Sequence, residues 1–436
     1  MEREMLSREE KRDLRRKRRR KNTMIAFATA AVLVVVLCIS IFLLIKLLTG
    51  NEKEDTQTKE IEEQISQILE EEEAIPEEPE EIPPTPEELE AMEREENIAS
   101  MIFNMTLEEK VAGLFMITPE ALTGTETVTQ AGDTTKAMLE KYPVGGLIYF
   151  KKNLESTEQV KDMISATLSF SKYPLFIAVD EEGGKVSRVA ESLGEENVGP
   201  MANIGAGGDT YAAYKATSTI ASYLTQYGFN VDFAPVADVV VSGQDSAIGD
   251  RAFGSDAAVV SSMVASAVKG LQENHVSACL KHFPGLGGTS EDTHLGMAET
   301  FRTKEEMEEN EWKPFKAGIS SGADFIMVGH ISANALTGDN RPCSLSSAVM
   351  TDILRGEMGY SGIIITDALN MGAISEYYSS SQAAIMALKS GADMILMPEN
   401  FKEAYEGVLE AVQNGTVSEE RITDSLTRIY RVKMKL

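Results

Sequence analysis

The sequence predicts an α/β protein whose main domain, residues 98–436, is a (β/α)₈ barrel, also called a TIM barrel. Short apolar runs, bounded by Gly, Pro or polar residues, alternate with longer amphipathic stretches. The runs are apolar throughout rather than at every second position, as expected for strands buried on both faces. There are eight of them, and eight parallel β/α units close into a barrel that a domain of this length accommodates with insertions.

The eight runs are VAGLFMI (111–117), GGLIYF (145–150), LFIAVD (175–180), VDFAPV (231–236), ACLKHF (278–283), FIMVGH (325–330), GIIITD (362–367) and MILMP (394–398). Amphipathic stretches between them, such as 156–170, 209–228 and 256–274, predict helices. This alternation predicts parallel pairing through right-handed crossovers. An open doubly wound sheet is the alternative, but its Gly-x-Gly-x-x-Gly turn is absent from FMITPEALTG, which follows the first run.

A membrane anchor is predicted in residues 23–49. Met24–Ile45 comprises 22 residues without a charge, which at 1.5 Å per residue can cross a bilayer core of roughly 30 Å. The basic segment before it, residues 1–22, predicts a cytoplasmic N-terminus and a single-pass membrane protein with its main domain outside the cell. A cleaved signal peptide is the alternative, but KLLTGNEKED after the run contains no small-x-small cleavage site.

Residues 50–97 are predicted to form a disordered linker rich in glutamate and proline. The stretch 51–100 carries 20 acidic and 3 basic side chains, and so much like charge with few apolar residues cannot bury a core. The net charge of the whole chain is −28. The main domain is acidic as well, and its field would repel phosphate, which argues against nucleic acid as a partner.

Polar residues recur where the predicted strands end, at Asp180, Asp238, Lys281 with His282, His330 and Asp367. Active sites of (β/α)₈ barrels lie at the C-terminal ends of the strands, so these positions predict a catalytic cleft. An aspartate at a strand end can instead cap the next helix. Asp367, before ALNMGAI, has both interpretations, as a helix N-cap and as a carboxylate nucleophile.

Two glycine-containing loops supply further polar side chains. In AVDEEGGKVSRV, three acidic residues precede a Gly-Gly turn, Lys185 and Arg188, and this composition suits recognition of the many hydroxyls of a sugar. In IGDRAFGSD, Arg251 lies on a glycine-flanked loop and offers a second hydrogen-bond donor.

The segment KHFPGLGGTSEDTH (281–294) holds two of the four histidines of the chain. A turn can bring Asp292 into contact with His294, which would fix the tautomer of the imidazole and raise the basicity of its other nitrogen. His294 is therefore a candidate proton carrier, with an ordinary surface histidine as the alternative. A metal site built from His282, His294 and carboxylates matches no standard zinc spacing, so neither a metal nor a cofactor is predicted.

KHFPGLGGTSEDTH, VDEEGG with its following arginine, DRAFG and ITDALNMGAI together resemble the family 3 glycoside hydrolases, in particular their single-domain β-N-acetylhexosaminidase branch. The resemblance covers roughly residues 98–436 and implies a (β/α)₈ barrel. It implies that Asp367 is the nucleophile of a covalent glycosyl-enzyme intermediate, and that His294 is the general acid/base in a dyad with Asp292. The residues that it implies for binding N-acetylglucosamine are Asp180, Arg188, Arg251, Lys281 and His282.

The expected function is that of a membrane-anchored, retaining exo-β-N-acetylglucosaminidase acting on muropeptides, which are fragments of peptidoglycan. A β-glucosidase, an N-acetylglucosaminide phosphorylase and a catalytically inert wall-binding barrel protein are the alternatives. Three departures from the branch leave fine specificity open. Leu286 replaces the usual His or Gln, and Glu181 and Lys185 alter the usual DQEGGRV. No oligomeric state follows from the sequence.

Overall fold

The computed structural model describes residues 85–241, 248–288 and 298–436. Within these residues, eight parallel strands form one sheet. The sheet order is β10-β1-β2-β3-β6-β7-β8-β9. These strands are β1 (Phe115–Ile117), β2 (Gly146–Ile148), β3 (Phe176–Val179), β6 (Val231–Asp232), β7 (Ser277–Phe283), β8 (Phe325–Val328), β9 (Ile363–Thr366) and β10 (Ile395–Leu396). A parallel bridge between Ile365 and Met394 links the two ends of this order, so the sheet curls into a nearly closed barrel.

Each of the eight predicted apolar runs overlaps one of these strands, which confirms the predicted parallel α/β barrel. All the strands except β7 are shorter than their runs, because the ends of a run lie beyond the paired part of the barrel. The first run differs most. Its first two residues belong to helix α4 (Leu107–Ala112), whose N-terminus is fixed by a capping box of Thr106 and Glu109.

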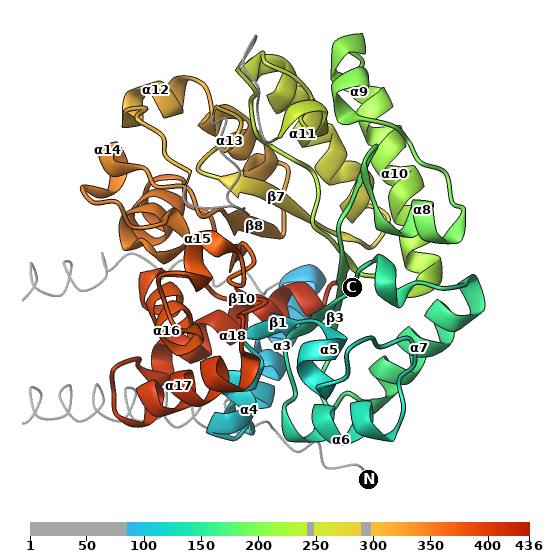
Figure 1. Cartoon of the computed structure of the whole chain (residues 1–436), viewed down its shortest axis with the longest axis vertical. Helices are drawn as coiled ribbons and strands as arrows, with labels where there is room; N and C mark the ends of the chain where they lie inside the picture. Colours follow the sequence, from blue (N-terminus) through green and yellow to red (C-terminus); the bar gives the residue numbers. More distant parts are fainter. Residues whose placement is uncertain (1–84, 242–247, 289–297) are drawn as a thin grey trace, which may run out of the picture. The chain divides into compact units, whose positions relative to one another are not determined.

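Helices lie around the outside of the barrel (Figure 1). The three predicted amphipathic helices are confirmed as α7 (Thr157–Phe170), α10 (Thr210–Tyr227) and α11 (Ala257–Gln272). Each begins after a residue whose side chain accepts a hydrogen bond from a backbone amide of the first turn, namely Ser156, Asp209 and Asp256.

Short helices and one hairpin complete the described fold. Before β7 they are α5 (Pro119–Thr123), α6 (Asp133–Lys141), η1 (Lys151–Asn153), the hairpin β4 (Glu181–Gly183) and β5 (Val186–Ser187), α8 (Arg188–Leu193), α9 (Met201–Gly207) and η2 (Gly249–Arg251). After β7 they are α12 (Lys304–Glu309), α13 (Trp312–Ser320), α14 (Asn334–Thr337), η3 (Cys343–Leu345), the π-helix η4 (Ala348–Glu357), α15 (Gly372–Ser375), α16 (Ser380–Ser390), α17 (Phe401–Gln413) and α18 (Glu419–Lys433).

Helix α3 (Pro86–Phe103) begins inside the segment predicted as linker. Thr85 and Glu88 form a capping box, and Pro86 occupies the first helical position, where a missing amide hydrogen costs nothing. Ile98 and Ile102 are buried, and Glu95 forms a bidentate ion pair with Arg431 of α18. The glutamates of residues 86–97 therefore lie on an ordered helix of the folded unit rather than on a disordered chain.

The predicted anchor, residues 23–49, and the remainder of the linker lie outside the described residues. Among the residues that are described, no helix combines the length and the apolar character needed to span a bilayer.

The barrel interior is filled by side chains. Phe176 of β3 and Phe325 of β8 belong to strands that are not neighbours in the sheet, yet their ring centroids lie 5.1 Å apart in an edge-to-face contact. Below them, at the N-terminal ends of the strands, the ammonium of Lys433 lies 4.9 Å from the centre of the Phe176 ring and 5.1 Å from that of Tyr430. Burial lowers the pKa of Lys433 to about 7.

We expect Lys433→Met to stabilise the folded domain by on the order of 1–3 kcal/mol at pH 6, because it removes a buried ammonium. The folded-state pKa of Lys433 lies below the unfolded value of about 10.4, so wild-type stability should rise as the pH increases from about 7 to 10. The gain from the substitution should therefore be smaller at pH 9 than at pH 6. Urea unfolding of the full chain in detergent measures both values. The exposed Lys402→Met is the control, and an equal gain at the two pH values would contradict the expectation.

Candidate active site

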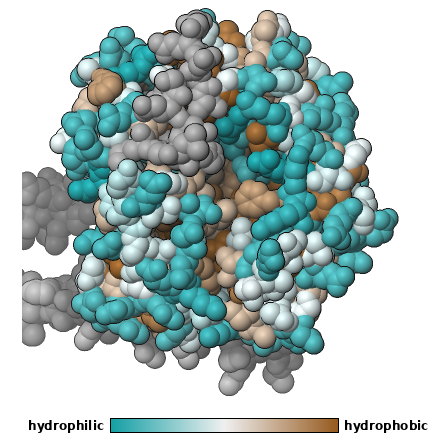
Figure 2. Space-filling view, in the orientation of Figure 1, coloured by the Kyte–Doolittle hydropathy of each residue, from teal (hydrophilic) through white to brown (hydrophobic). Residues whose placement is uncertain are grey.

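A cavity of about 520 Å³ lies at the C-terminal ends of the barrel strands, where the cleft was predicted. It brings together the predicted residues Asp180, Arg188, Arg251, Lys281, His282 and Asp367. The other lining residues are Ile148, Phe150, Glu182, Lys185, Val186, Phe233, Ile248, Leu286, Met327, Ala368, Asn370, Met371, Leu396 and Met397. Figure 2 shows hydrophobic side chains along the middle of the face viewed in Figure 1, between hydrophilic flanks.

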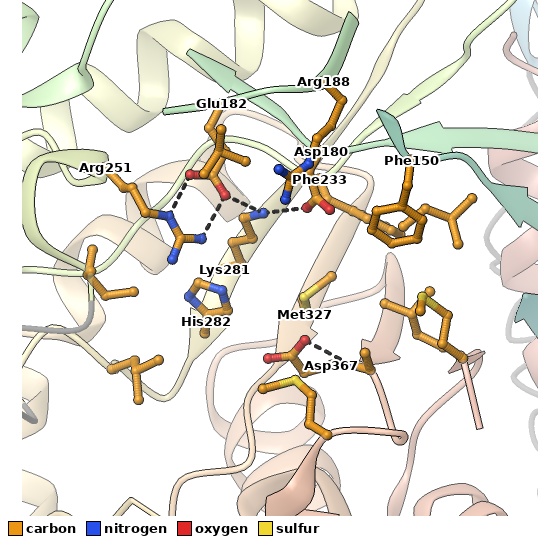
Figure 3. Close-up of a pocket in the computed structure, with 18 of the residues that line it drawn as sticks. Phe150, Asp180, Glu182, Arg188, Phe233, Arg251, Lys281, His282, Met327 and Asp367 are labelled. Carbon is orange, nitrogen blue, oxygen red and sulfur yellow. Dashed lines mark hydrogen bonds and ion pairs between the residues drawn. The ribbon is translucent and has the colours of Figure 1, made fainter. Parts of the chain in front are cut away.

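Glu182 is the centre of a buried cluster of charges in this cavity (Figure 3). Its carboxylate accepts two hydrogen bonds of 2.7 Å from the Nε and Nη2 atoms of Arg251. The ammonium of Lys281 lies 2.7 Å from the same carboxylate and donates a hydrogen bond of 2.8 Å to Asp180. Glu182 thus binds two cations and Lys281 binds two carboxylates, and these contacts hold both cations in fixed positions.

The charges of this cluster support one another's ionisation. Burial alone would raise the pKa of Glu182, but Lys281 and Arg251 outweigh burial and lower the pKa to about 2. Burial likewise opposes the charged form of Lys281, yet Asp180 and Glu182 hold its pKa above the usual range. Glu182 and Lys281 are therefore both charged at neutral pH.

Glu182 was not predicted as a site residue, although its position in the sequence contains the signal. Asp180 ends the strand run and Glu182 lies two residues later, in the hairpin strand β4. Side chains two apart along extended backbone face the same side. The alternation therefore indicates that Asp180 and Glu182 point together into the cavity and that Glu181 points away from it.

Glu181 caps a helix instead of facing the cavity. Its carboxylate accepts hydrogen bonds from the backbone amides of Val189 and Ala190, at 2.6 and 3.0 Å, in the first turn of α8. It also accepts one of 2.9 Å from the hydroxyl of Tyr223. The departure from the usual DQEGGRV at this position therefore changes the support beneath the cavity rather than its lining.

Arg188 is the first residue of α8, so the Glu181 cap fixes the backbone from which its side chain reaches the cavity. The Nε atom of Arg188 is buried without a hydrogen-bond partner among the described residues. A buried donor without a partner is costly, and a ligand oxygen in the cavity would satisfy it. Lys185, another departure, is largely exposed at the cavity wall and pairs with Asp250 at 3.1 Å.

Asp238 lies behind His282 and fixes its orientation. One carboxylate oxygen lies 2.8 Å from Nδ1 of His282 and accepts a hydrogen bond of 3.2 Å from the backbone amide of that residue. The other accepts a hydrogen bond of 2.6 Å from the backbone amide of Leu286. Because a carboxylate only accepts, Nδ1 carries a hydrogen, and the Nε2 atom of the neutral ring presents a lone pair.

Leu286 is buried, lines the cavity, and starts the segment that leads to Asp292 and His294. Its side chain makes this part of the wall apolar, where the related branch usually places a polar residue. Lys281 and His282, joined by a cis peptide bond, both line the cavity although they are adjacent. Asp292 and His294 lie outside the described residues.

Asp367 does not cap a helix, so that interpretation is wrong. The next helix, α15, begins only at Gly372, and the Asp367 carboxylate accepts a hydrogen bond of 2.8 Å from the amide of Ala368. His330 holds the same turn, since its Nε2 lies 2.9 Å from the carbonyl oxygen of Ala368. Burial would raise the pKa of Asp367, but His330 and the hydrogen bond from the Ala368 amide oppose it and the pKa is lowered, so the cavity contains a carboxylate at neutral pH.

In residues 85–241, 248–288 and 298–436, no group of three or more His, Cys, Asp or Glu side chains could hold a metal ion. In the described cavity, the Asp367 carboxylate faces a set of fixed hydrogen-bond donors and acceptors.

Comparison with known proteins identifies related sequences and structures. Residues 106–432 match the glycosyl hydrolase family 3 N-terminal domain. Beta-hexosaminidase A of Pseudoalteromonas piscicida is 32% identical over 328 residues, which make up 69% of this chain and 54% of that protein. The chain thus spans little more than half the length of this relative. A beta-hexosaminidase of Stenotrophomonas maltophilia is 35% identical over 297 residues, covering 65% of this chain and 84% of that protein.

Solved structures resemble the fold as well. A glycoside hydrolase family 3 β-N-acetylglucosaminidase from a Paenibacillus species is similar with a TM-score of 0.71 and 36% sequence identity. The similarity covers 76% of this chain and 62% of that one. A family 3 glycosyl hydrolase from Mycobacterium smegmatis gives a TM-score of 0.67 at 28% identity, over 76% of this chain and 98% of that one.

We expect Glu182→Gln to destabilise the domain by about 3 kcal/mol at pH 7, because it leaves two buried cations with one carboxylate between them. The folded-state pKa of about 2 lies below the unfolded value, so the contribution of Glu182 is present above pH 4.5 and lost as the pH falls toward 2. The difference in stability between wild type and variant should therefore shrink in acid. Denaturant unfolding at pH 7 and pH 3 measures it, with the exposed Glu410→Gln as control. A difference that stays constant across this range would be inconsistent with the ion pairs.

We expect nuclear magnetic resonance to find neutral His282 with its hydrogen on Nδ1 in the wild type, and a mixture of tautomers in Asp238→Ala. The carboxylate is the acceptor that selects the tautomer. Long-range proton–nitrogen correlations report which ring nitrogen carries the hydrogen. The chain has only four histidines, and His282→Gln identifies the signals of this one. A hydrogen on Nε2 in the wild type would refute the role of Asp238.

Proposed function

Because the chain belongs to glycosyl hydrolase family 3, we propose that it is a retaining exo-β-N-acetylglucosaminidase. Its sequence motifs predicted both this family and the glycoside hydrolase class. The observation that supports this proposal is a single cavity in which a carboxylate faces a cluster of fixed charged groups. Beta-hexosaminidases among the relatives, and a β-N-acetylglucosaminidase among the similar structures, favour an N-acetylated sugar over glucose.

In the proposed complex, the polar side of the cavity holds the hydroxyls and the acetamido group of a terminal N-acetylglucosamine. Asp180 and His282 offer acceptors, while Lys281, Arg188 and Arg251 offer donors at positions set by their ion pairs and by the Glu181 cap. Phe150, Phe233 and Met327 also line the cavity (Figure 3), and their apolar side chains suit the apolar face of a pyranose ring. In this proposal the cavity binds one sugar, the terminal unit, as removal of terminal units requires.

In the proposed mechanism, the Asp367 carboxylate attacks the anomeric carbon as the glycosidic bond breaks, which forms a glycosyl ester. The leaving oxygen takes a proton from His294, oriented by Asp292, and His294 then removes a proton from the water that hydrolyses the ester. Two displacements at one carbon retain its configuration. The lowered pKa of Asp367 supports the nucleophile role, because only the ionised carboxylate attacks.

We further propose that the enzyme is anchored by residues 23–49 with its barrel outside the cell, where peptidoglycan fragments are the available substrates. The apolar run Met24–Ile45 and the basic residues before it support this location. Mass spectrometry of products formed from purified muropeptides tests the substrate, because an exo-acting enzyme releases free N-acetylglucosamine.

We expect the full chain to hydrolyse p-nitrophenyl N-acetyl-β-D-glucosaminide, and Asp367→Ala to lower kcat by more than about a thousandfold through loss of the nucleophile. His294→Ala should lower kcat by about 10²–10⁴-fold through loss of proton transfer. His275→Asn, at an exposed histidine, is the control and should retain full activity. Activity on the β-glucoside alone, or a product sugar 1-phosphate whose formation requires phosphate, would reject the proposal in favour of a β-glucosidase or a phosphorylase. Inactivity on all of these substrates would favour a binding protein.

A further inference from the structure

A second hollow, of about 430 Å³, lies along the outer face of α10; we call it the α10 groove. One wall consists of Tyr211, Tyr214, Ser218 and Ser222, which are three or four residues apart and therefore share one face of the helix. The other wall includes Glu195 and Glu196, which follow the end of α8. None of these residues lines the cavity that contains Asp367.

Two tyrosines present an aromatic surface in this groove. The ring centroids of Tyr211 and Tyr214 lie 6.1 Å apart, and the ring planes are within 18° of each other. The hydroxyl of Tyr214 donates a hydrogen bond of 2.8 Å to Glu273, which holds that ring in place. Tyr211 is 66% exposed, although a large side chain gains stability from burial. Tyr214 is held in place and Tyr211 is exposed, and together they offer a surface on which another flat apolar face can stack.

The remainder of the groove is polar, and its charged side chains are Lys215 and the two glutamates. Hydroxyl, amide and carboxylate groups of Ser218, Thr219, Gln226 and Glu195 line it next to the rings. A pyranose ring matches this combination, since its faces are apolar and its edge carries hydroxyls. The two adjacent glutamates and the net charge of −28 disfavour an anionic polymer. An uncharged glycan is therefore the class of ligand that fits best.

The groove lies one short helix away from the cavity. Arg188, the first residue of α8, lines the cavity, and Glu195 follows the residue that caps the other end. The six residues of α8 span roughly 9 Å at 1.5 Å per residue. Tyr223 in the floor of the groove donates its hydroxyl to Glu181, the carboxylate that caps α8. The same short segment thus contributes to both sites.

We propose that the α10 groove is a second glycan-binding site, which holds an uncharged β-linked chain of N-acetylated sugars by stacking it on Tyr211 and Tyr214. The choice of an N-acetylated chain rests on the proposed function, whereas the site itself rests on the groove. A substrate attached to a longer glycan would be held there while the cavity takes a terminal sugar.

The test uses the full chain in detergent, with Asp367→Ala to prevent turnover and excess N-acetylglucosamine to occupy the cavity. Calorimetry measures binding of chitohexaose, a chain of six β-linked N-acetylglucosamine units. Addition of Tyr211→Ala should weaken binding about tenfold, the effect of losing one stacked ring. Tyr211→Phe keeps the ring and should restore affinity, and Tyr377→Ala, at another exposed tyrosine, should leave it unchanged. Equal affinity with and without Tyr211→Ala would overturn the inference.

A second readout separates this inference from the proposed function. Tyr211→Ala in an otherwise wild-type chain should hydrolyse the small chromogenic substrate within about twofold of the wild-type rate, because one sugar does not reach the groove. If the protein hydrolyses the chromogenic substrate but binds the hexasaccharide equally well with and without Tyr211→Ala, the glycan-binding site in the groove is rejected and the proposed enzymatic function stands. If binding depends on Tyr211 but the protein has no hydrolytic activity, the glycan-binding site in the groove stands and the proposed enzymatic function is rejected.

Discussion

One shared carboxylate, that of Glu182, determines the shape of the cavity. Arg251 comes from a loop after β6 and Lys281 from the end of β7, and both point at Glu182 in the hairpin after β3. Two buried cations cannot lie so close together without a carboxylate between them. The ion pairs therefore fix the relative position of three separate segments at the C-terminal ends of the strands, before any ligand is bound.

A second layer of carboxylates holds the residues that face the cavity. Glu181 fixes the start of α8 and with it Arg188, while Asp238 fixes both the ring of His282 and the backbone at Leu286. These acidic residues are buried and accept hydrogen bonds from the backbone as well as from side chains. Each one therefore couples the position of a functional side chain to the course of the chain around it, which keeps the cavity rigid.

The sequence predicts the barrel well because strands buried on both faces are apolar throughout, and this pattern does not depend on distant contacts. It also locates Asp180, Lys281 and Asp367, since strand ends follow directly from the strands. The distinction between lining and supporting residues is harder to predict. His330 ends a strand run as Asp367 does, and Asp238 lies just past one, yet both lie behind the cavity, because the direction of a side chain at a strand end depends on the turn that follows.

Helix α3 and the α10 groove are two further features that the sequence alone does not predict. The glutamates of α3 have the composition of a solvated chain, and only the contacts of Ile98 and Ile102 with the domain reveal a packed helix. The groove walls come from α10 and from the residues after α8. No local pattern predicts that these two segments lie together, although the spacing of the tyrosines places both on one helix face.

The position of α3 has a mechanical consequence. Glu95 of α3 pairs with Arg431 of α18, and Lys433, near the end of α18, packs beneath Phe176 at the start of β3. The helix through which the preceding chain enters the domain is therefore attached near the N-terminal ends of the strands. Tension applied through residues before Thr85 would load the contact between α3 and α18 first. The side chains around Asp367 lie at the opposite ends of the strands, so a pull on the chain would leave their geometry unchanged.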